Sequence, residues 1–201
     1  MKKDKQTCSW PTGDPLLIEY HDREWGVPLH DDRKLFEFLL LEGFQAGLSW
    51  LTVLRKRENF RKAFDGFDFN KVARYDEMKI NSLMNDSGII RNRLKIESAV
   101  LNAKAFIKTR KEFGTFDKYI WGFTGGKTIN NGFRSLKELP ARTELSDLIS
   151  KDLKKRGFKF VGSTIVYAHM QATGMVNDHI RDCYRFKEIM RGAGDGGKFR
   201  K

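Results

Sequence analysis

The chain has 201 residues, of which 40% are hydrophobic and 12% aromatic, so it can bury a substantial core, and this composition argues against bulk disorder. Lysine and arginine number 38 against 26 acidic residues, and the resulting net charge of +12 favours a polyanionic partner. No apolar run reaches membrane-spanning length and the first residues lack a signal-peptide stretch, so we expect a cytoplasmic protein without a membrane partner.

The pattern is helical along almost the whole chain, and no alternating strand pattern competes with it. Apolar residues surround the segment 34–42, which predicts a buried helix capped by Asp31 or Asp32. Further helices are predicted, in chain order, at 48–60, 76–84, 92–113, 143–156 and 162–173.

Two segments are predicted to lack regular structure. Residues 124–142 are rich in Gly, Asn, Thr and Lys, which is typical of a loop. From Arg185 onward, glycine and basic residues predict a mobile tail. We therefore expect a monomer with one all-α domain at 1–184, which could divide into two helical lobes, followed by a tail at 185–201.

Each of the two cysteines has a histidine beside it, and the two pairs lie near opposite ends of the chain. Cys8 is followed by His21 in a C-x12-H spacing, and His179 by Cys183 in an H-x3-C spacing. Two thiolates and two imidazoles can form a structural tetrahedral zinc site, which would tie the ends of the domain together. The alternative is inert buried thiols and unrelated histidines. Both cysteines and two of only four histidines fall into the pattern, so the spacing favours zinc.

A tight connection at 85–93 lies between two predicted helices. Gly88 frees backbone amides at the start of the next helix, where the amides and the helix dipole can bind phosphate. Arg91, Arg93 and Lys95 stand beside it. This arrangement looks like a helix-hairpin-helix, which clamps the DNA backbone without reading sequence. The alternative is an ordinary turn with solvated basic residues.

Aromatic residues crowd the N-terminal part of the chain around one acidic residue, Glu42. They are Trp10, Tyr20, Trp25 and Trp50. Aromatic faces stack on nucleobases, and a carboxylate can accept hydrogen bonds from a base edge. For any single residue, core packing is the simpler explanation; the joint set of base-sized aromatics and a carboxylate favours a base pocket.

An ordered series of motifs runs from Cys8 to Cys183. They are DPL at 14–16, YHD at 20–22, EWGVP at 24–28, LEG at 41–43, QAGLSW at 45–50, KREN at 56–59, GIIR at 88–91, LKKRGFKFVG at 153–162, MQA at 170–172 and VNDH at 176–179. This series closely resembles the bacterial 3-methyladenine DNA glycosylase I family, and its length makes the resemblance highly specific.

The resemblance implies a helix-hairpin-helix DNA glycosylase that removes N3-methyladenine from alkylated double-stranded DNA and leaves an abasic site. It implies hydrolysis without strand cleavage, since no lysine nucleophile is indicated. By motif, Glu42 matches the carboxylate that recognises the base, Tyr20 and Trp50 match pocket aromatics, and Trp10 and Trp25 would be further walls. The zinc ligands of the family match Cys8, His21, His179 and Cys183.

Two interpretations of Leu48 remain open. Leu48 would fill the gap left by a flipped base, as apolar wedges do, or it is a plain core leucine at the head of a helix. Two other functions are weighed against the glycosylase. A zinc-stabilised DNA-binding module would not need the aromatic and carboxylate set, and a zinc hydrolase would need an open metal position.

Overall fold

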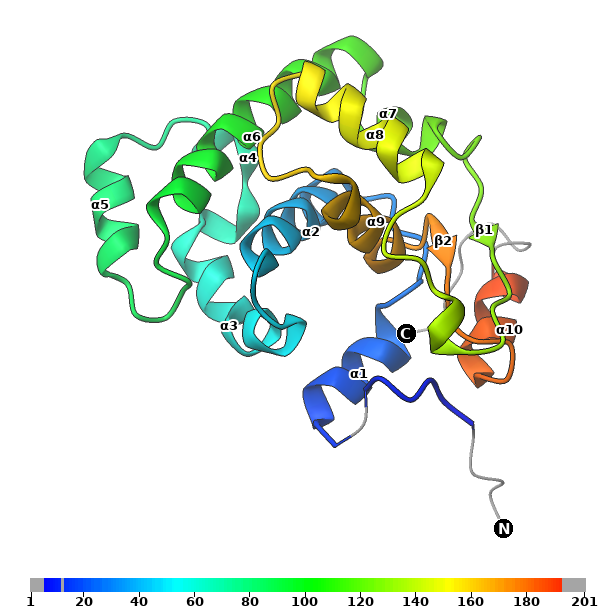
Figure 1. Ribbon diagram of the computed structural model, residues 1–201. Helices are drawn as coiled ribbons and strands as arrows, with labels where there is room; N and C mark the ends of the chain where they lie inside the picture. The colour runs from blue at the N-terminus through cyan, green and yellow to red at the C-terminus, as the bar shows by residue number, and fades with distance from the viewer. Residues whose placement is uncertain (1–5, 12, 193–201) are drawn as a thin grey trace.

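The mostly helical prediction is confirmed in a computed structural model that describes residues 6–11 and 13–192. Figure 1 shows α2 and α9 at the centre, with the other helices arranged around them. None of the described helices is both long and apolar enough to cross a bilayer. The elements are α1 Pro15–Arg23, α2 Asp32–Gln45, α3 Trp50–Ala63, η1 Asp65–Phe67, α4 Phe69–Val72, α5 Glu77–Asn85, α6 Arg93–Phe113, α7 Phe116–Gly122, β1 Ile129–Asn130, η2 Leu136–Glu138, α8 Glu144–Lys155, α9 Ser163–Ala172, β2 Val176–Asn177 and α10 Tyr184–Gly192.

Helix α2 forms the centre of the core. Every residue from Leu35 to Phe44 is buried, and the helix packs against α3, α6, α7 and α9. Asp31 caps it, because its carboxylate accepts a hydrogen bond from the amide of Lys34 at 2.9 Å. A helix buried on all sides must carry apolar residues all round, which is the pattern seen in the sequence.

Side-chain caps fix where the other predicted helices begin. Asp76 and Asn92, the first residues of two predicted segments, cap α5 and α6. Thr143 caps α8: its hydroxyl accepts from the Ser146 amide, and its own amide donates to the Ser146 hydroxyl. Helix α3 begins two residues later than predicted, because the Ser49 hydroxyl accepts from the amide of Thr52. Leu48 therefore lies before the helix rather than in its first turn.

The segment 124–142 is mostly loop but contributes one short strand. Ile129 pairs with Val176 and Asn130 with Asn177, in parallel. The prediction of no strand was wrong at this point, because a two-residue strand is too short for alternation to reveal it. The pairing fixes the loop beside the end of α9.

The tail predicted from Arg185 begins as a helix instead. Helix α10 spans Tyr184–Gly192, and Arg185 and Ile189 are buried. The prediction of a mobile segment is therefore wrong for 185–192, where an amphipathic face packs on the domain; residues 193–201 lie outside the described part of the chain. The amide of Tyr184, the first residue of α10, donates to the Gln6 carbonyl at 2.9 Å, so α10 lies against the N-terminal segment.

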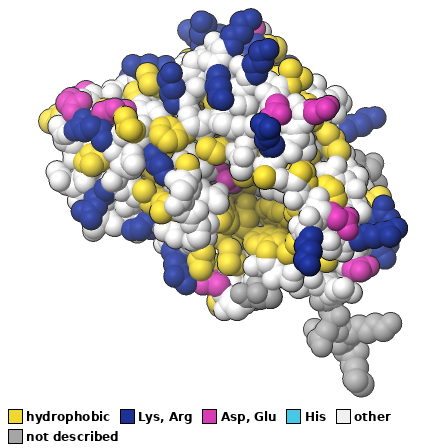
Figure 2. Space-filling model, viewed as in Figure 1, with side chains coloured by type: hydrophobic (Ala, Val, Ile, Leu, Met, Phe, Trp, Pro, Cys, Tyr) yellow, Lys and Arg dark blue, Asp and Glu magenta, His cyan; other side chains and the backbone are white. Residues whose placement is uncertain are grey.

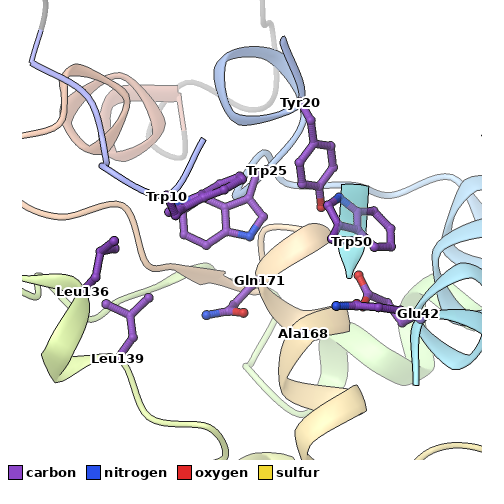
Figure 3. A pocket seen from close by; sticks show the side chains of 10 residues that line it. Trp10, Tyr20, Trp25, Glu42, Trp50, Leu136, Leu139, Ala168 and Gln171 are labelled. Carbon is purple, nitrogen blue, oxygen red and sulfur yellow. The ribbon is translucent and has the colours of Figure 1, made fainter. Parts of the chain in front are cut away.

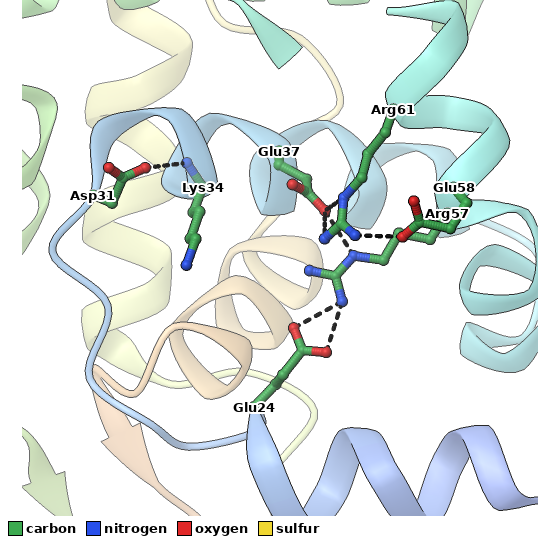
Figure 4. Close-up of polar contacts among 7 residues, drawn as sticks. All are labelled: Glu24, Asp31, Lys34, Glu37, Arg57, Glu58 and Arg61. Carbon is green, nitrogen blue, oxygen red and sulfur yellow. Dashed lines mark hydrogen bonds and ion pairs between the residues drawn. The ribbon is translucent and has the colours of Figure 1, made fainter. Parts of the chain in front are cut away.

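A buried ion-pair network joins α1, α2 and α3 (Figure 4). The Arg57 guanidinium donates to Glu37 at 2.6 Å and to both oxygens of Glu24 at 2.7 and 2.9 Å. Arg61 also donates to Glu37, at 2.8 and 3.0 Å. Because α1 carries residues of the site described below, this network sets where they lie relative to α2.

Gly174 lets the chain after α1 pass close to the end of α9. Its φ is +72°, and a Cβ at this position would lie 2.4 Å from the backbone nitrogen of Pro28. Any side chain would collide with that backbone, so glycine is required here. The close approach places Trp25 next to α9.

His169 on α9 is buried, and both of its ring nitrogens lack a hydrogen-bond partner among the described residues. Burial lowers its pKa to about 4. In the unfolded chain the histidine pKa is about 6.5. Between about pH 6.5 and 4 the unfolded state is therefore protonated at His169 while the folded state is not, so stability falls as the pH drops through this range.

We predict that His169→Phe raises stability at neutral pH by about 1 kcal/mol or more, because it removes two unpaired polar atoms. The gain over wild type should increase by up to ~3 kcal/mol at pH 4. Urea unfolding at several pH values measures both effects. An unchanged or smaller gap at low pH would show that His169 is protonated in the folded protein.

Candidate base-binding pocket and metal centre

A pocket of about 330 Å³ opens between α1, α2 and α9. Figure 2 shows it as a hollow lined mostly by apolar side chains. Figure 3 shows the side chains that line it. They are Trp10, Tyr20, Trp25, Glu42, Gln45, Trp50, Leu136, Leu139, Ala168 and Gln171. The pocket therefore brings together the carboxylate and all four aromatic residues singled out in the sequence.

Glu42 is the acidic residue of this pocket. Its side chain belongs to the last turn of α2 and is only 4% exposed. No described residue forms an ion pair or hydrogen bond with the carboxyl, and burial raises its pKa to about 8. An unpaired carboxyl is costly to bury, so this site is poised for a ligand that donates hydrogen bonds or carries positive charge.

The aromatic rings form two adjoining groups around the pocket. Trp10 and Trp25 meet edge to face with ring centroids 5.1 Å apart, and Tyr20 and Trp50 lie 5.3 Å apart. Burial raises the pKa of Tyr20 well above its usual value, helped by the nearby Glu42, so its hydroxyl stays protonated. The four rings offer flat, electron-rich surfaces on which a ligand ring can stack.

Half of the pocket wall was not predicted from the sequence. Gln45 and Gln171 lie within motifs already noted, but nothing there distinguished them from core or surface residues. Leu136 and Leu139 come from the segment predicted as a plain loop, and only the folded chain brings them to the pocket. No local signal could have found these two leucines.

The four Cys and His side chains predicted as zinc ligands meet at one buried point. Their ligand atoms all lie within 4.8 Å of one another. Cys183 Sγ is 3.5 Å from both His21 Nε2 and His179 Nδ1, and Cys8 Sγ is 3.7 Å from His179 Nδ1. A tetrahedral zinc with bonds of about 2.0–2.3 Å needs ligand separations of about 3.3–3.8 Å.

The outer nitrogens of both histidines fix the tautomers that a metal requires. His21 Nδ1 lies 2.7 Å from the Asp22 carboxylate, and His179 Nε2 lies 2.9 Å from the Trp25 carbonyl. Each outer nitrogen therefore donates, which leaves His21 Nε2 and His179 Nδ1 as lone pairs only 3.1 Å apart. Two facing lone pairs repel unless a cation lies between them, so the donor set fits a bound metal.

Comparisons with known proteins decide the family. The methyladenine glycosylase family model matches residues 10–186. DNA-3-methyladenine glycosylase 1 of Escherichia coli strain K12 is 49% identical over 178 residues, which cover 89% of this chain and 95% of that protein. The chain belongs to the methyladenine glycosylase family. The resemblance drawn from the sequence motifs is confirmed.

Solved structures of this family share the fold. A crystal structure of 3-methyladenine DNA glycosylase I has a TM-score of 0.87 and 49% identity, and the match covers 89% of this chain and 98% of that one. A second structure, of 3-methyladenine DNA glycosylase I from Staphylococcus aureus, has a TM-score of 0.86 and 36% identity. The match covers 89% of this chain and 95% of that one, and the structure is described as the basis of 3-methyladenine recognition by that enzyme.

In this family member some backbone groups of the α5–α6 connection already have hydrogen-bond partners within the protein and cannot bind a phosphate. The amide of Gly88 donates to the Asp86 carboxylate at 2.7 Å, and its carbonyl accepts from Lys56 at 3.3 Å. A Cβ at Gly88 would lie 2.9 Å from that carboxylate and 3.2 Å from the Asn59 side chain, so close packing explains this glycine. The Gly88 amide is therefore engaged, and the Ile89 amide donates to the Asp86 carbonyl at 3.4 Å, whereas the amides of Ile90 and Arg91 bond to no described group.

The three basic residues predicted beside this connection have different environments. Arg91 is exposed, and its guanidinium has no partner in the described part of the chain. Arg93 pairs with Glu77 at 2.6 Å and with Glu97 at 3.2 Å. The Lys95 ammonium lies inside the protein, where it donates to the carbonyls of Phe44 and Ala46 at 2.9 and 2.6 Å.

Lys95 therefore does not present its charge to a DNA backbone, and its predicted role as a phosphate contact is wrong in this geometry. It instead satisfies carbonyls at the C-terminal end of α2, where a positive charge is favourable. Burial lowers the pKa of its ammonium. The residue thus joins the start of α6 to the turn that follows Glu42.

Leu48 lies in the turn between α2 and α3, beside the pocket residues Gln45 and Trp50. Its side chain is 43% exposed. The core-leucine alternative is therefore wrong, because the chain leaves α2 at Gln45 and turns outward before Ser49 caps α3. The Leu48 amide donates to the carbonyl of the pocket residue Gln45 at 2.6 Å, so this exposed side chain is available to contact a ligand.

Proposed function

We propose that this protein is a DNA glycosylase that flips N3-methyladenine out of alkylated double-stranded DNA and hydrolyses its N-glycosidic bond. The product is an abasic site, and the strand is not cut. The observation that carries the proposal is the buried, unpaired carboxyl of Glu42 inside an aromatic pocket. Two relatives are named for 3-methyladenine removal. We expect the protein to act as a monomer in the cytoplasm.

The chemistry of the lesion matches the pocket. Methylation at N3 makes adenine cationic, and a cationic base stacks favourably on the faces of Tyr20, Trp50 and their neighbours. The base leaves as a neutral molecule, so its departure needs little acid catalysis. Glu42 then serves to select the base, by accepting a hydrogen bond and balancing its charge. Among the described residues, the pocket lining contains no lysine, in keeping with hydrolysis rather than strand cleavage.

We propose that the α5–α6 connection binds a DNA phosphate through the amides of Ile90 and Arg91, and not through the amide of Gly88, which is bonded to Asp86. The amides of Ile90 and Arg91, which have no partner among the described residues, precede α6, where the helix dipole favours an anion, and Arg91 adds an exposed positive charge. The exposed Leu48, in the turn between the pocket residues Gln45 and Trp50, would fill the space left by the flipped base.

Replacing Arg91 with alanine should weaken binding to all duplexes alike and reduce the slope of log affinity against log salt by about 1. Lys95→Met should leave that slope unchanged but destabilise the fold by about 1–3 kcal/mol, because two carbonyls lose their donor. Salt titrations with undamaged duplex and urea unfolding separate the two residues. A smaller slope of log affinity against log salt in Lys95→Met would show that Lys95 contacts a phosphate after all.

We further propose that Cys8, His21, His179 and Cys183 hold a structural zinc ion. Four protein donors leave no open position for an activated water, so the metal would stabilise the fold and take no part in hydrolysis. The fit rests on the separations of the ligand atoms and on the tautomers set by Asp22 and Trp25.

The direct test is release of free base from methylated duplex DNA, with separate detection of strand breaks. We expect N3-methyladenine in the supernatant and intact strands until alkali is added. Duplex binding without release would instead identify a DNA-binding module, and strand breaks without alkali would contradict the monofunctional mechanism.

A further inference from the structure

Gln171 occupies the pocket wall on α9, opposite the helix that carries Glu42. Figure 3 shows its amide reaching from α9 into the space beside Trp25. Its backbone is fixed as well, since its carbonyl accepts the amide of Gly26 at 2.9 Å. The residue is thus held in place at both ends and faces the ligand space.

A buried carboxylate behind the wall determines how this amide is turned. Asp178 is 1% exposed and accepts from Asn131 at 2.7 Å, Tyr167 at 2.6 Å and Gln171 Nε2 at 2.8 Å. A carboxylate can only accept hydrogen bonds, so it takes the NH₂ end of Gln171. The carbonyl oxygen, Oε1, is left without a partner among the described residues.

We propose that Gln171 is a second base-reading residue and that Asp178 positions it with its acceptor toward the base. This inference rests on the proposed function. The 6-amino group of N3-methyladenine carries two hydrogens. Glu42 accepts one, and Gln171 Oε1 accepts the other. A purine with a carbonyl at the same position would set oxygen against oxygen and be rejected.

The arrangement predicts that Asp178→Asn changes selectivity, not only affinity. An asparagine can donate its own NH₂ to Gln171 Oε1, which turns the amide and presents its NH₂ group to the base. The pocket would then repel the amino group and accept a carbonyl. Gln171→Leu removes the acceptor and offers no donor, so it should weaken binding of the amino purine alone.

The test uses free bases and the intrinsic fluorescence of the pocket tryptophans. Dissociation constants are measured for 3-methyladenine and for its 6-oxo analogue 3-methylhypoxanthine. Gln171→Leu should bind 3-methyladenine about tenfold more weakly than wild type. Asp178→Asn should reduce the preference for the amino base by at least about tenfold.

Tyr167→Phe is the matched control, because it removes another hydrogen bond to the same oxygen of Asp178 and leaves Gln171 tethered. It should lower stability and keep the wild-type preference. Melting temperature and zinc content are measured for all variants, since Asp178 adjoins His179. If Asp178→Asn does not fold, the affinities of Gln171→Leu for the two bases decide whether Gln171 reads the base.

The two proposals fail in different ways. Wild-type protein that does not bind 3-methyladenine would overturn the proposed function. Wild-type protein that binds and discriminates, with folded Gln171→Leu and Asp178→Asn that discriminate equally well, would overturn only the role of Gln171 and Asp178.

Discussion

Replacing Cys8 or Cys183 with alanine should release one zinc ion per chain and lower the melting temperature by about 10 °C or more. Metal-binding free energy is folding free energy when the site forms only in the folded chain, and ~4 kcal/mol corresponds to a shift of this size in a domain of about 200 residues. Cys8 precedes α1 and Cys183 precedes α10, so the loss should free both ends of the domain.

The same change should also weaken binding of the methylated base, although the metal lies outside the pocket. His21 follows Tyr20 directly, and the Trp25 carbonyl bonds to His179. Loosening both histidines therefore moves two pocket walls, Tyr20 and Trp25. A pocket that keeps full affinity in zinc-free protein would show that the walls are held by other contacts.

Metal analysis, melting curves and base affinity together test this prediction. His30→Ala is the control, because His30 is exposed and pairs with Asp117 and does not belong to the cluster of four ligands. It should keep its zinc and most of its stability. Purified wild-type protein without metal, and cysteine variants that melt as wild type does, would contradict the zinc proposal.

The features that the sequence predicted well are those that depend on neighbouring residues. Asp31, Asp76 and Asn92 cap helices where expected, because a cap needs only a side chain two or three residues before an amide. The Cys and His residues were found for a different reason. Their number is so small that two paired spacings in one chain were informative, even though the ligands meet only in the fold.

The predictions that failed depend on contacts between distant segments. Lys95 looked like a phosphate contact, but carbonyls about fifty residues earlier in the chain bind its ammonium. Arg93 pairs with Glu77 and Glu97 but stays 43% exposed, so its predicted contact with DNA remains a prediction. The loop leucines Leu136 and Leu139 reach the pocket because β1 pairs with β2, and no local pattern reveals such pairing.

Glu42→Gln should lower excision of N3-methyladenine by about 100-fold or more, while duplex binding stays near the wild-type level. Glutamine keeps the shape but removes the charge that balances the cationic base. The pH profile adds a second test. Because burial raises the pKa of Glu42 to about 8, the free protein holds a proton there at neutral pH. Excision at low substrate concentration should rise with pH up to about 8 in wild type and stay flat in the variant.

The same variant should be more stable than wild type, and the sign follows from the pKa. In the unfolded chain the carboxyl ionises near ~4.3, so between that pH and about 8 the folded state holds a proton that the unfolded state has lost. The wild-type protein therefore loses stability as the pH rises through this window, by a few kcal/mol at most, and Glu42→Gln does not.

Glu37→Gln is the matched control, since Glu37 is buried on the same helix but pairs with Arg57 and Arg61. Removing its charge takes away the buried carboxylate that the two guanidinium groups share and leaves each with one more exposed partner, Glu24 for Arg57 and Glu58 for Arg61, so this variant should be less stable than wild type. Opposite shifts in melting temperature for the two variants, together with lost excision in Glu42→Gln alone after correction for folding, are the expected result. Wild-type excision by folded Glu42→Gln, or a flat wild-type pH profile, would show that the charge of this carboxylate does not select the base.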